Sequence, residues 1–317
     1  MALYYMARAV IGLAQLLPLT LVARLGRLGG ALAYALDKRH RRVTQRNLAM
    51  CFANEKSPAE IRELARENFR RIGESFACAV KTAAMDIEEL RPHVEFVAPA
   101  FTHPPAKAGA GESGPASEPA IPAGAAQPES VVAAIGHFGN FELYARFGQF
   151  APAYQCATTY RGLRQASLNR LMQSLRERSG CLFFERRFDA AALKAFMNQP
   201  GIMLGLLSDQ HAGDHGLRLP FLGHDCSTSA APAIFALRYH CALYTGVCYR
   251  VGLARWRIEQ GRRIPTHENG KPRSTREIML DVNAAFEEAV RRDPANWFWV
   301  HNRWKIRKPA GNGKKGK

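Results

Sequence analysis

The feature that most constrains the fold is a repeated alternation of short apolar runs and helical patterns that begins after residue 130. The runs have the length and composition of strands: SVVAAIG, YQCATTY, GIMLGLLSDQ, CALYTGVCYR and ARWRIEQ. The segments between or beside them have helical periodicity: NFELYARFGQF, ASLNRLMQSLRERSG, FDAAALKAFMNQ and SAAPAIFALRYH. Alternation of this kind predicts an α/β fold with a mixed, largely parallel sheet flanked by helices, which binds ligands at the carboxyl ends of strands.

Composition excludes a disordered chain and narrows the partners. The 317 residues are 47% hydrophobic and 22% charged, which is ample for a packed core. Forty-four basic against 27 acidic residues give a net charge of +17, so the surface should attract phosphates on lipid or nucleic acid, or an acidic carrier protein. The seven cysteines contain no C-x-x-C pair, which argues against a zinc ribbon or a disulfide framework and fits a reducing compartment.

Residues 1–48 form an apolar segment that we expect to associate with a membrane. Only fifteen uncharged residues separate Arg8 from Arg24, and Pro18 interrupts them, whereas a straight spanning helix needs roughly 20. The basic residues that follow oppose translocation, so a secretory signal is not expected and the body of the protein should stay cytoplasmic. The segment is either a short or tilted anchor or a helix in the membrane interface, and a buried core helix is the alternative.

The rest of the chain divides into four parts. Residues 49–98 are an amphipathic helical region, whose main helix starts with a capping box formed by Ser57 and Glu60, with Pro58 at its first position. Residues 99–130 are rich in Pro, Ala and Gly and predict a flexible loop. Residues 131–308 should form the catalytic core, and residues 309–317 should form a basic tail.

The stretch VVAAIGHFGNFEL places polar groups where a buried strand ends. If His137 lies in the turn and Glu142 in the first helical turn, the carboxylate can fold back to the imidazole, fix its tautomer and leave the other nitrogen as a general base. Backbone N–H groups near Gly139 and Asn140 could then stabilise an oxyanion. A structural histidine is the alternative interpretation of this weak motif. The chain has no G-x-S-x-G elbow, so the proton that the base takes could be the substrate's own.

Two other patterns suggest different chemistry. DQHAGDHG followed by GHD gathers histidines and carboxylates, but their spacing matches no zinc motif, and we expect no metal site. PANWFWVHNRWK mixes tryptophans with bases as nucleic-acid proteins do, but we interpret Trp297, Trp299 and Trp304 as packing and interface residues and expect no nucleic-acid partner.

Five ordered motifs together resemble one family. HFGNFE, YR at residues 160–161, LLSDQ, LPFLG at residues 219–223 and PANWFWVHNRWK are similar in order and spacing to the bacterial lipid A biosynthesis (late, or secondary) acyltransferases. RRVTQRNLAMCF resembles the amino-terminal half of that family. The resemblance covers most of residues 1–308, apart from the loop at 99–130.

The resemblance implies a glycerolipid-acyltransferase-like core at the cytoplasmic face of the inner membrane, without metal or redox cofactor. It implies transfer of a fatty acyl group from an acyl carrier protein thioester to a hydroxyl of an anionic lipid A precursor, with no covalent enzyme intermediate. On that view His137 is the general base and Glu142 orients it. Arg161, Asp209 and Gln210 match family positions near the substrate. A related enzyme using acyl-CoA with a glycolipid or lysophospholipid, and a non-catalytic basic membrane- or nucleic-acid-binding protein, are the alternatives.

Overall fold

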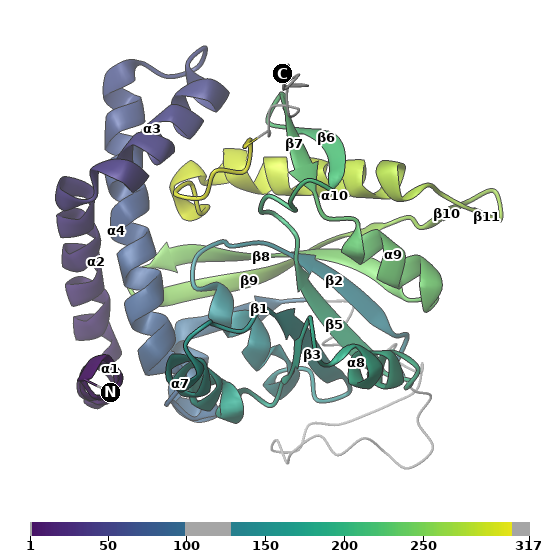
Figure 1. Ribbon diagram of the computed structural model, residues 1–317, viewed down its shortest axis with the longest axis horizontal. Helices are drawn as coiled ribbons and strands as arrows, with labels where there is room; N and C mark the ends of the chain where they lie inside the picture. The colour runs from purple at the N-terminus through teal and green to yellow at the C-terminus, as the bar shows by residue number, and fades with distance from the viewer. Residues whose placement is uncertain (1, 99–127, 306–317) are drawn as a thin grey trace, which may run out of the picture.

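A seven-stranded mixed sheet forms the centre of the molecule in a computed structural model that describes residues 2–98 and 128–305 (Figure 1). Its strand order is β1-β9-β8-β2-β5-β3-β4. All neighbouring strands run parallel except β8 and β9, which form an antiparallel pair. The strands are β1 Val94–Val97, β2 Val131–Ile135, β3 Gln155–Tyr160, β4 Leu182–Glu185, β5 Ile202–Leu207, β8 Ala242–Gly252 and β9 Arg255–Ile264. The predicted α/β class and largely parallel sheet are thus confirmed.

Helices cover both faces of this sheet. Helix α9 (Ala231–Arg238) packs against β2 and β8, and α10 (Thr275–Arg292) against β8 and β9 (Figure 1). The 3₁₀ segment η2 (Phe141–Gln149) contacts β3 and β8. The other helical segments after residue 130 are α7 Ala166–Arg176, η3 Glu177–Ser179, α8 Ala190–Met197 and η4 Pro294–Asn296. Two hairpins lie outside the main sheet: β6 Leu217–Phe221 with β7 His224–Thr228, and β10 His267–Glu268 with β11 Lys271–Pro272.

The expected strands and helices are present, with one difference in kind and several additions. The segment after β2 is 3₁₀ rather than α-helical. The sequence patterns did not include β1, β4, the two hairpins or α10. Strands β1 and β4 are four residues each and lie at the two edges of the sheet, where a short strand carries little hydrophobic pattern of its own.

Residues 2–93 are helical and lie beside the sheet. They contain α1 Ala2–Leu16, α2 Leu19–Leu36, α3 Lys38–Phe52, α4 Pro58–Thr82, α5 Ile87–Leu90 and η1 Arg91–His93 (Figure 1). Pro18 separates α1 from α2, because proline has no N–H to continue a helix and here precedes the first residue of α2. The predicted capping box at Ser57 and Glu60 is present at the start of α4.

Glycines allow α2 and α4 to approach closely. A Cβ atom on Gly30 would meet the backbone of Phe69 and Arg70, and one on Gly73 would meet the backbone of Gly26 and Gly30. Large apolar side chains cover the opposite side of the first two helices and are exposed: Tyr5, Met6, Val10, Leu13, Leu16, Leu21, Leu25, Leu28, Leu32 and Leu36. By length and composition α2 could cross a membrane, and only 22% of it is buried in the protein.

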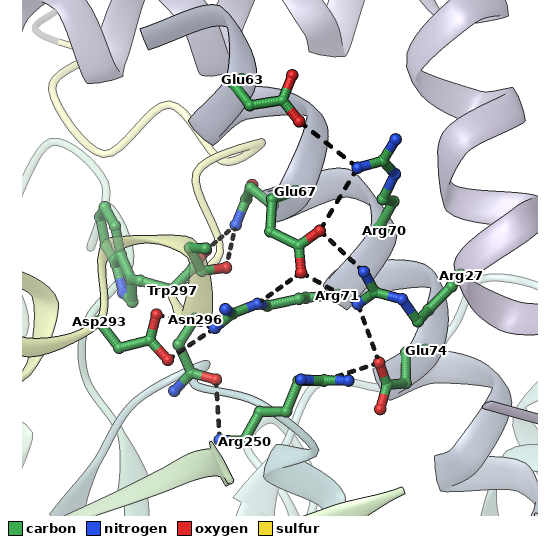
Figure 2. A network of polar contacts seen from close by, with 12 residues as sticks. Arg27, Glu63, Glu67, Arg70, Arg71, Glu74, Arg250, Asp293, Asn296 and Trp297 are labelled. Atoms are coloured by element: carbon green, nitrogen blue, oxygen red, sulfur yellow. Dashed lines mark hydrogen bonds and ion pairs between the residues drawn. The ribbon is translucent and has the colours of Figure 1, made fainter. Parts of the chain in front are cut away.

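A network of ion pairs joins the amino-terminal helices to one another and to the sheet (Figure 2). Arg27 of α2 contacts Glu67 and Glu74 of α4. Glu74, whose side chain is 1% exposed, also accepts from Nε of Arg250 in β8 at 2.8 Å. A buried carboxylate is costly without partners, and this one has two arginines and the Ala254 backbone N–H.

Candidate active site

His137 and Asp209 lie side by side at the carboxyl ends of two neighbouring strands. Strands β2 and β5 pair in parallel with Ile135 opposite Leu207, so the residues that follow each strand emerge at one edge. Nδ1 of His137 lies 2.8 Å from Oδ1 of Asp209, and the His137 backbone N–H donates to Oδ2 at 2.9 Å. This two-point contact fixes the imidazole and directs Nε2 away from the carboxylate.

Asp209 is buried and charged. Burial by itself raises its pKa, but the charge of His137, two hydrogen bonds from that residue and the charge of Arg303 outweigh it and lower the pKa to about 2. The indole Nε1 of Trp297 also donates to Oδ2, at 2.8 Å. An ionised carboxylate at Nδ1 favours the tautomer with the proton on Nδ1, so Nε2 carries a free lone pair and can accept a proton.

The carboxylate beside His137 is therefore Asp209, which corrects the expectation that Glu142 orients this histidine. Glu142 accepts from Arg176 at both oxygens, over 3.1 Å from Nε and 2.7 Å from Nη2. The reason is topological: the 3₁₀ segment that begins at Phe141 carries Glu142 toward α7, while the pairing of β2 with β5 brings Asp209 to Nδ1. Both Glu142 and Arg176 line the cavity described below.

Gly139 also has a different role from the one expected. Its N–H donates to the carbonyl of Asn296 at 3.0 Å and is therefore occupied rather than free for an oxyanion. Its φ of +49° and the nearby Cys248 carbonyl, which an added Cβ would meet, both require glycine. Asn140 is buried at 1% exposure and does not line the cavity described below. This turn thus fixes the position of His137 by joining it to the Asn296–Trp297 segment.

A cavity of about 630 Å³ opens beside His137. Its floor is one face of the sheet, where the small residues Ala133, Gly205 and Gly246 lie on three adjacent strands. It follows β5 from Met203 to Leu207, which is roughly 13 Å of extended chain. Aromatic and apolar side chains complete the walls: Phe141, Tyr144, Phe147, Cys156, Met172, Phe183 and Ile258.

The polar lining of this cavity includes three arginines. Arg161, Arg176 and Arg186 line it together with Gln210 and His211. The structure therefore brings His137, Glu142, Arg161 and Gln210 around one cavity, with Asp209 behind the histidine. Such a site can hold a long apolar group along the sheet and place a polar or anionic group beside Nε2.

Trp297 is a site residue that the sequence reasoning missed. The sequence of its segment predicts a packing role, and the ring is 1% exposed, but its indole N–H also donates a hydrogen bond to the carboxylate that holds His137. An available signal was the rule that buried indole N–H groups find polar partners. Among residues 2–98 and 128–305, no group of three or more His, Cys, Asp or Glu side chains could hold a metal ion.

Fold and site together define a class: an α/β protein in which a partly buried histidine, paired with a buried aspartate, borders a long, mainly apolar cavity. The chain belongs to the bacterial lipid A biosynthesis acyltransferase family, whose model matches residues 1–306. The resemblance in the five motifs is thus confirmed over nearly the whole length, and the family supports an acyltransferase activity. No match was found among individually curated proteins.

Proposed function

We propose that this protein transfers a fatty acyl group from an acyl carrier protein thioester to a hydroxyl of an anionic lipid A precursor. The observation that carries this proposal is the His137–Asp209 pair at the mouth of an apolar cavity. The cavity suits an acyl chain, and Nε2 of His137 suits removal of a proton from a hydroxyl. Membership of the family supports the lipid A precursor as the acceptor.

In the proposed mechanism, His137 takes the proton of the acceptor hydroxyl while the hydroxyl oxygen attacks the thioester carbonyl carbon. A tetrahedral intermediate collapses, the carbon–sulfur bond breaks, and the thiolate leaves after receiving the proton from the imidazolium. Asp209 stays ionised throughout and stabilises the imidazolium, as its low pKa allows. No covalent enzyme intermediate is required, because both reactants are held in one ternary complex.

Cations beside the cavity support an anionic acceptor. Arg161 is exposed at the carboxyl end of β3, and Arg186 follows β4, so both guanidinium groups can reach a phosphate near the strand ends. Gln210 adds an amide beside His137. These three residues form the proposed acceptor site, whereas the cavity along β5 receives the donor chain.

A membrane location follows from the same proposal. Lipid A biosynthesis enzymes are membrane-associated, and α1 with α2 presents the exposed apolar side chains that a bilayer would cover. We place this face on the cytoplasmic side of the inner membrane, where the exposed Arg24 of α2 and the exposed basic residues of α3 meet anionic headgroups. The acceptor would then reach the site without leaving the bilayer surface.

Product analysis by mass spectrometry tests the proposal. Purified protein in detergent is mixed with acyl carrier protein or CoA thioesters of several lengths and with a lipid A precursor or a lysophospholipid. We expect one acyl group to be added to the lipid A precursor, and His137→Ala to lower the rate by about 10²- to 10⁴-fold. His93→Ala is the control, because the His93 ring bonds the Ala254 carbonyl outside the cavity.

Each alternative predicts another result. Acylation of lysophospholipid from CoA, with none of the lipid A precursor, identifies the related enzyme. Free fatty acid without any acylated lipid identifies a thioesterase. Equal rates for the His137→Ala variant and the parent protein contradict the mechanism, and no turnover with intact membrane binding favours a non-catalytic protein.

A further inference from the structure

Trp297 makes a polar contact that packing alone does not require. Its Nε1 lies 2.8 Å from Oδ2 of Asp209, on the oxygen that also accepts from the His137 backbone. The carboxylate thus receives donors from three groups: the imidazole, a backbone N–H and the indole. Because Asp209 is completely buried, the direction of its carboxyl plane depends on these donors.

The segment that carries Trp297 is held by contacts on both sides. Asn68 of α4 donates its side-chain amide to the carbonyls of Ala295, at 2.9 Å, and Trp297, at 2.6 Å. Asn296 donates to the Cys248 carbonyl at 2.9 Å and accepts from the Gly139 N–H. A backbone with so many fixed points leaves the indole N–H little freedom.

Ion pairs extend this support to the amino-terminal helices (Figure 2). Asp293, just before the segment, accepts from Nη1 of Arg71 at 2.8 and 2.7 Å. Arg71 in turn donates to Glu67, which pairs with Arg27 of α2. The position of the indole therefore depends on α4, and through α4 on the packing of α2.

We propose that Trp297 is a positioning residue for catalysis, which holds the Asp209 carboxylate in the plane that orients His137. The inference rests on the proposed role of His137 as general base. Trp297 does not touch substrate in this proposal, since it does not line the cavity and its ring packs against Phe221 and Trp299. Its effect should therefore appear in kcat and leave KM unchanged.

Trp299 provides a matched control two residues away. It is also a fully buried tryptophan, but its Nε1 donates to the carbonyl of Pro294 at 2.7 Å instead of to a carboxylate. Trp297→Phe and Trp299→Phe each remove one indole N–H and a similar volume from the same cluster. The difference between the variants isolates the bond to Asp209.

The experiment measures steady-state kinetics and the NMR signal of the proton between His137 and Asp209 in the full-length protein. We expect Trp297→Phe to lower kcat by about 10- to 100-fold with KM unchanged, as removal of one bond to a charged group predicts. The downfield Nδ1 proton, assigned by its loss in His137→Ala, should shift or broaden in Trp297→Phe. Trp299→Phe should retain both kcat and this resonance, and thermal unfolding should show that both variants fold.

Two results separate failure of this inference from failure of the proposed function. If Trp297→Phe and Trp299→Phe have equal kcat and identical Nδ1 proton resonances, while His137→Ala is inactive, the positioning role is wrong and the proposed base stands. If no pairing of thioester and lipid gives an acylated product, the proposed function fails, and if His137→Ala keeps full activity, His137 is not the general base. The NMR comparison still decides whether the indole holds the carboxylate, because it needs no turnover.

Discussion

The guanidinium of Arg176 donates to both carboxylate oxygens of Glu142, and the pair lies in the wall of the cavity that His137 borders. The guanidinium also lies 4.9 Å from the centre of the Phe183 ring. Bidentate pairing of this kind is geometrically specific, so Glu142 shapes the site by holding Arg176 in place. In this structure Glu142, the last residue of the H-x-x-x-x-E motif, pairs with Arg176, whereas Asp209 contacts Nδ1 of His137.

A double-mutant cycle should reveal this pairing in the kinetics. Glu142→Ala and Arg176→Ala each leave an unpaired charge in the cavity wall, so each should lower kcat/KM. The double variant should be about as active as the weaker single variant, because the same interaction is lost once. An equivalent cycle on Arg273 and Asp281, a partly buried pair at 2.8 Å, should leave kcat/KM unchanged. Fully multiplicative losses at Glu142 and Arg176 would show that the two residues act independently.

The ionisation of Asp209 should make stability depend on pH. Its pKa falls from 3.8 to about 2 in the folded protein, so its contribution to stability is present above pH 4 and is lost as the pH falls toward 2. The lost contribution is roughly 2 kcal/mol in the free energy of unfolding. Asp209→Asn should flatten this part of the curve of unfolding free energy against pH. Asp225→Asn, at an exposed site, should keep the slope of the parent protein.

The same substitution should also impair catalysis. The neutral amide introduced by Asp209→Asn can no longer stabilise an imidazolium, and its NH₂ group can present a donor to Nδ1 of His137, which would favour the wrong tautomer. We expect kcat to fall by about 10²- to 10⁴-fold, which the acyl-transfer assay measures directly. Retention of full activity at neutral pH would show that the carboxylate does not assist the base.

The small floor of the cavity predicts a change in chain-length preference. Ala133→Leu adds volume at the centre of the sheet face, between Gly205 and Tyr244 on the neighbouring strands. The variant should favour shorter acyl thioesters than the parent protein, in competition assays with a series of chain lengths. An unchanged profile in a folded variant would place the acyl chain elsewhere.

The contact between α2 and α4 should be sensitive to a single methyl group. Gly30→Ala would press against the backbone of Phe69 and Arg70, and we expect a loss of about 1–3 kcal/mol in the free energy of unfolding. Gly29→Ala is the control on the same helix, since a Cβ there meets nothing within 4 Å. It should be neutral or stabilising, because alanine favours a helix over glycine by about 1 kcal/mol. Chemical unfolding in detergent measures both variants, and equal stabilities would contradict close packing at Gly30.

The predicted domain layout stays a prediction. The segments at 99–130 and 309–317 lie largely or wholly outside the described residues. The break at Pro18 was visible in the sequence, but the resulting pair of helices and their packing on α4 were not, because glycine contacts between helices leave no local pattern.

Local sequence determined the main strands, their order along the chain and the two places where polar residues end an apolar run, at His137 and at Asp209. The strands are recognisable because a parallel strand that is buried on both faces consists of consecutive apolar residues. Local sequence could not determine which carboxylate meets the imidazole. Glu142 is near His137 in sequence, whereas Asp209 is 72 residues away and Trp297 lies another 88 residues beyond.

Only the tertiary structure determines which carboxylate contacts the imidazole of His137. The sheet places β5 directly beside β2, so two distant strand ends become neighbours, and the turn at Gly139 anchors the Asn296–Trp297 segment behind them. The contacts of His137 with Asp209 and of Asp209 with Trp297 depend on strand order and on long-range hydrogen bonds. The hydrophobic periodicity of a single segment cannot predict them. Most residues at the site were therefore predictable from sequence, while their partnerships were decided by the packing of segments far apart in the chain.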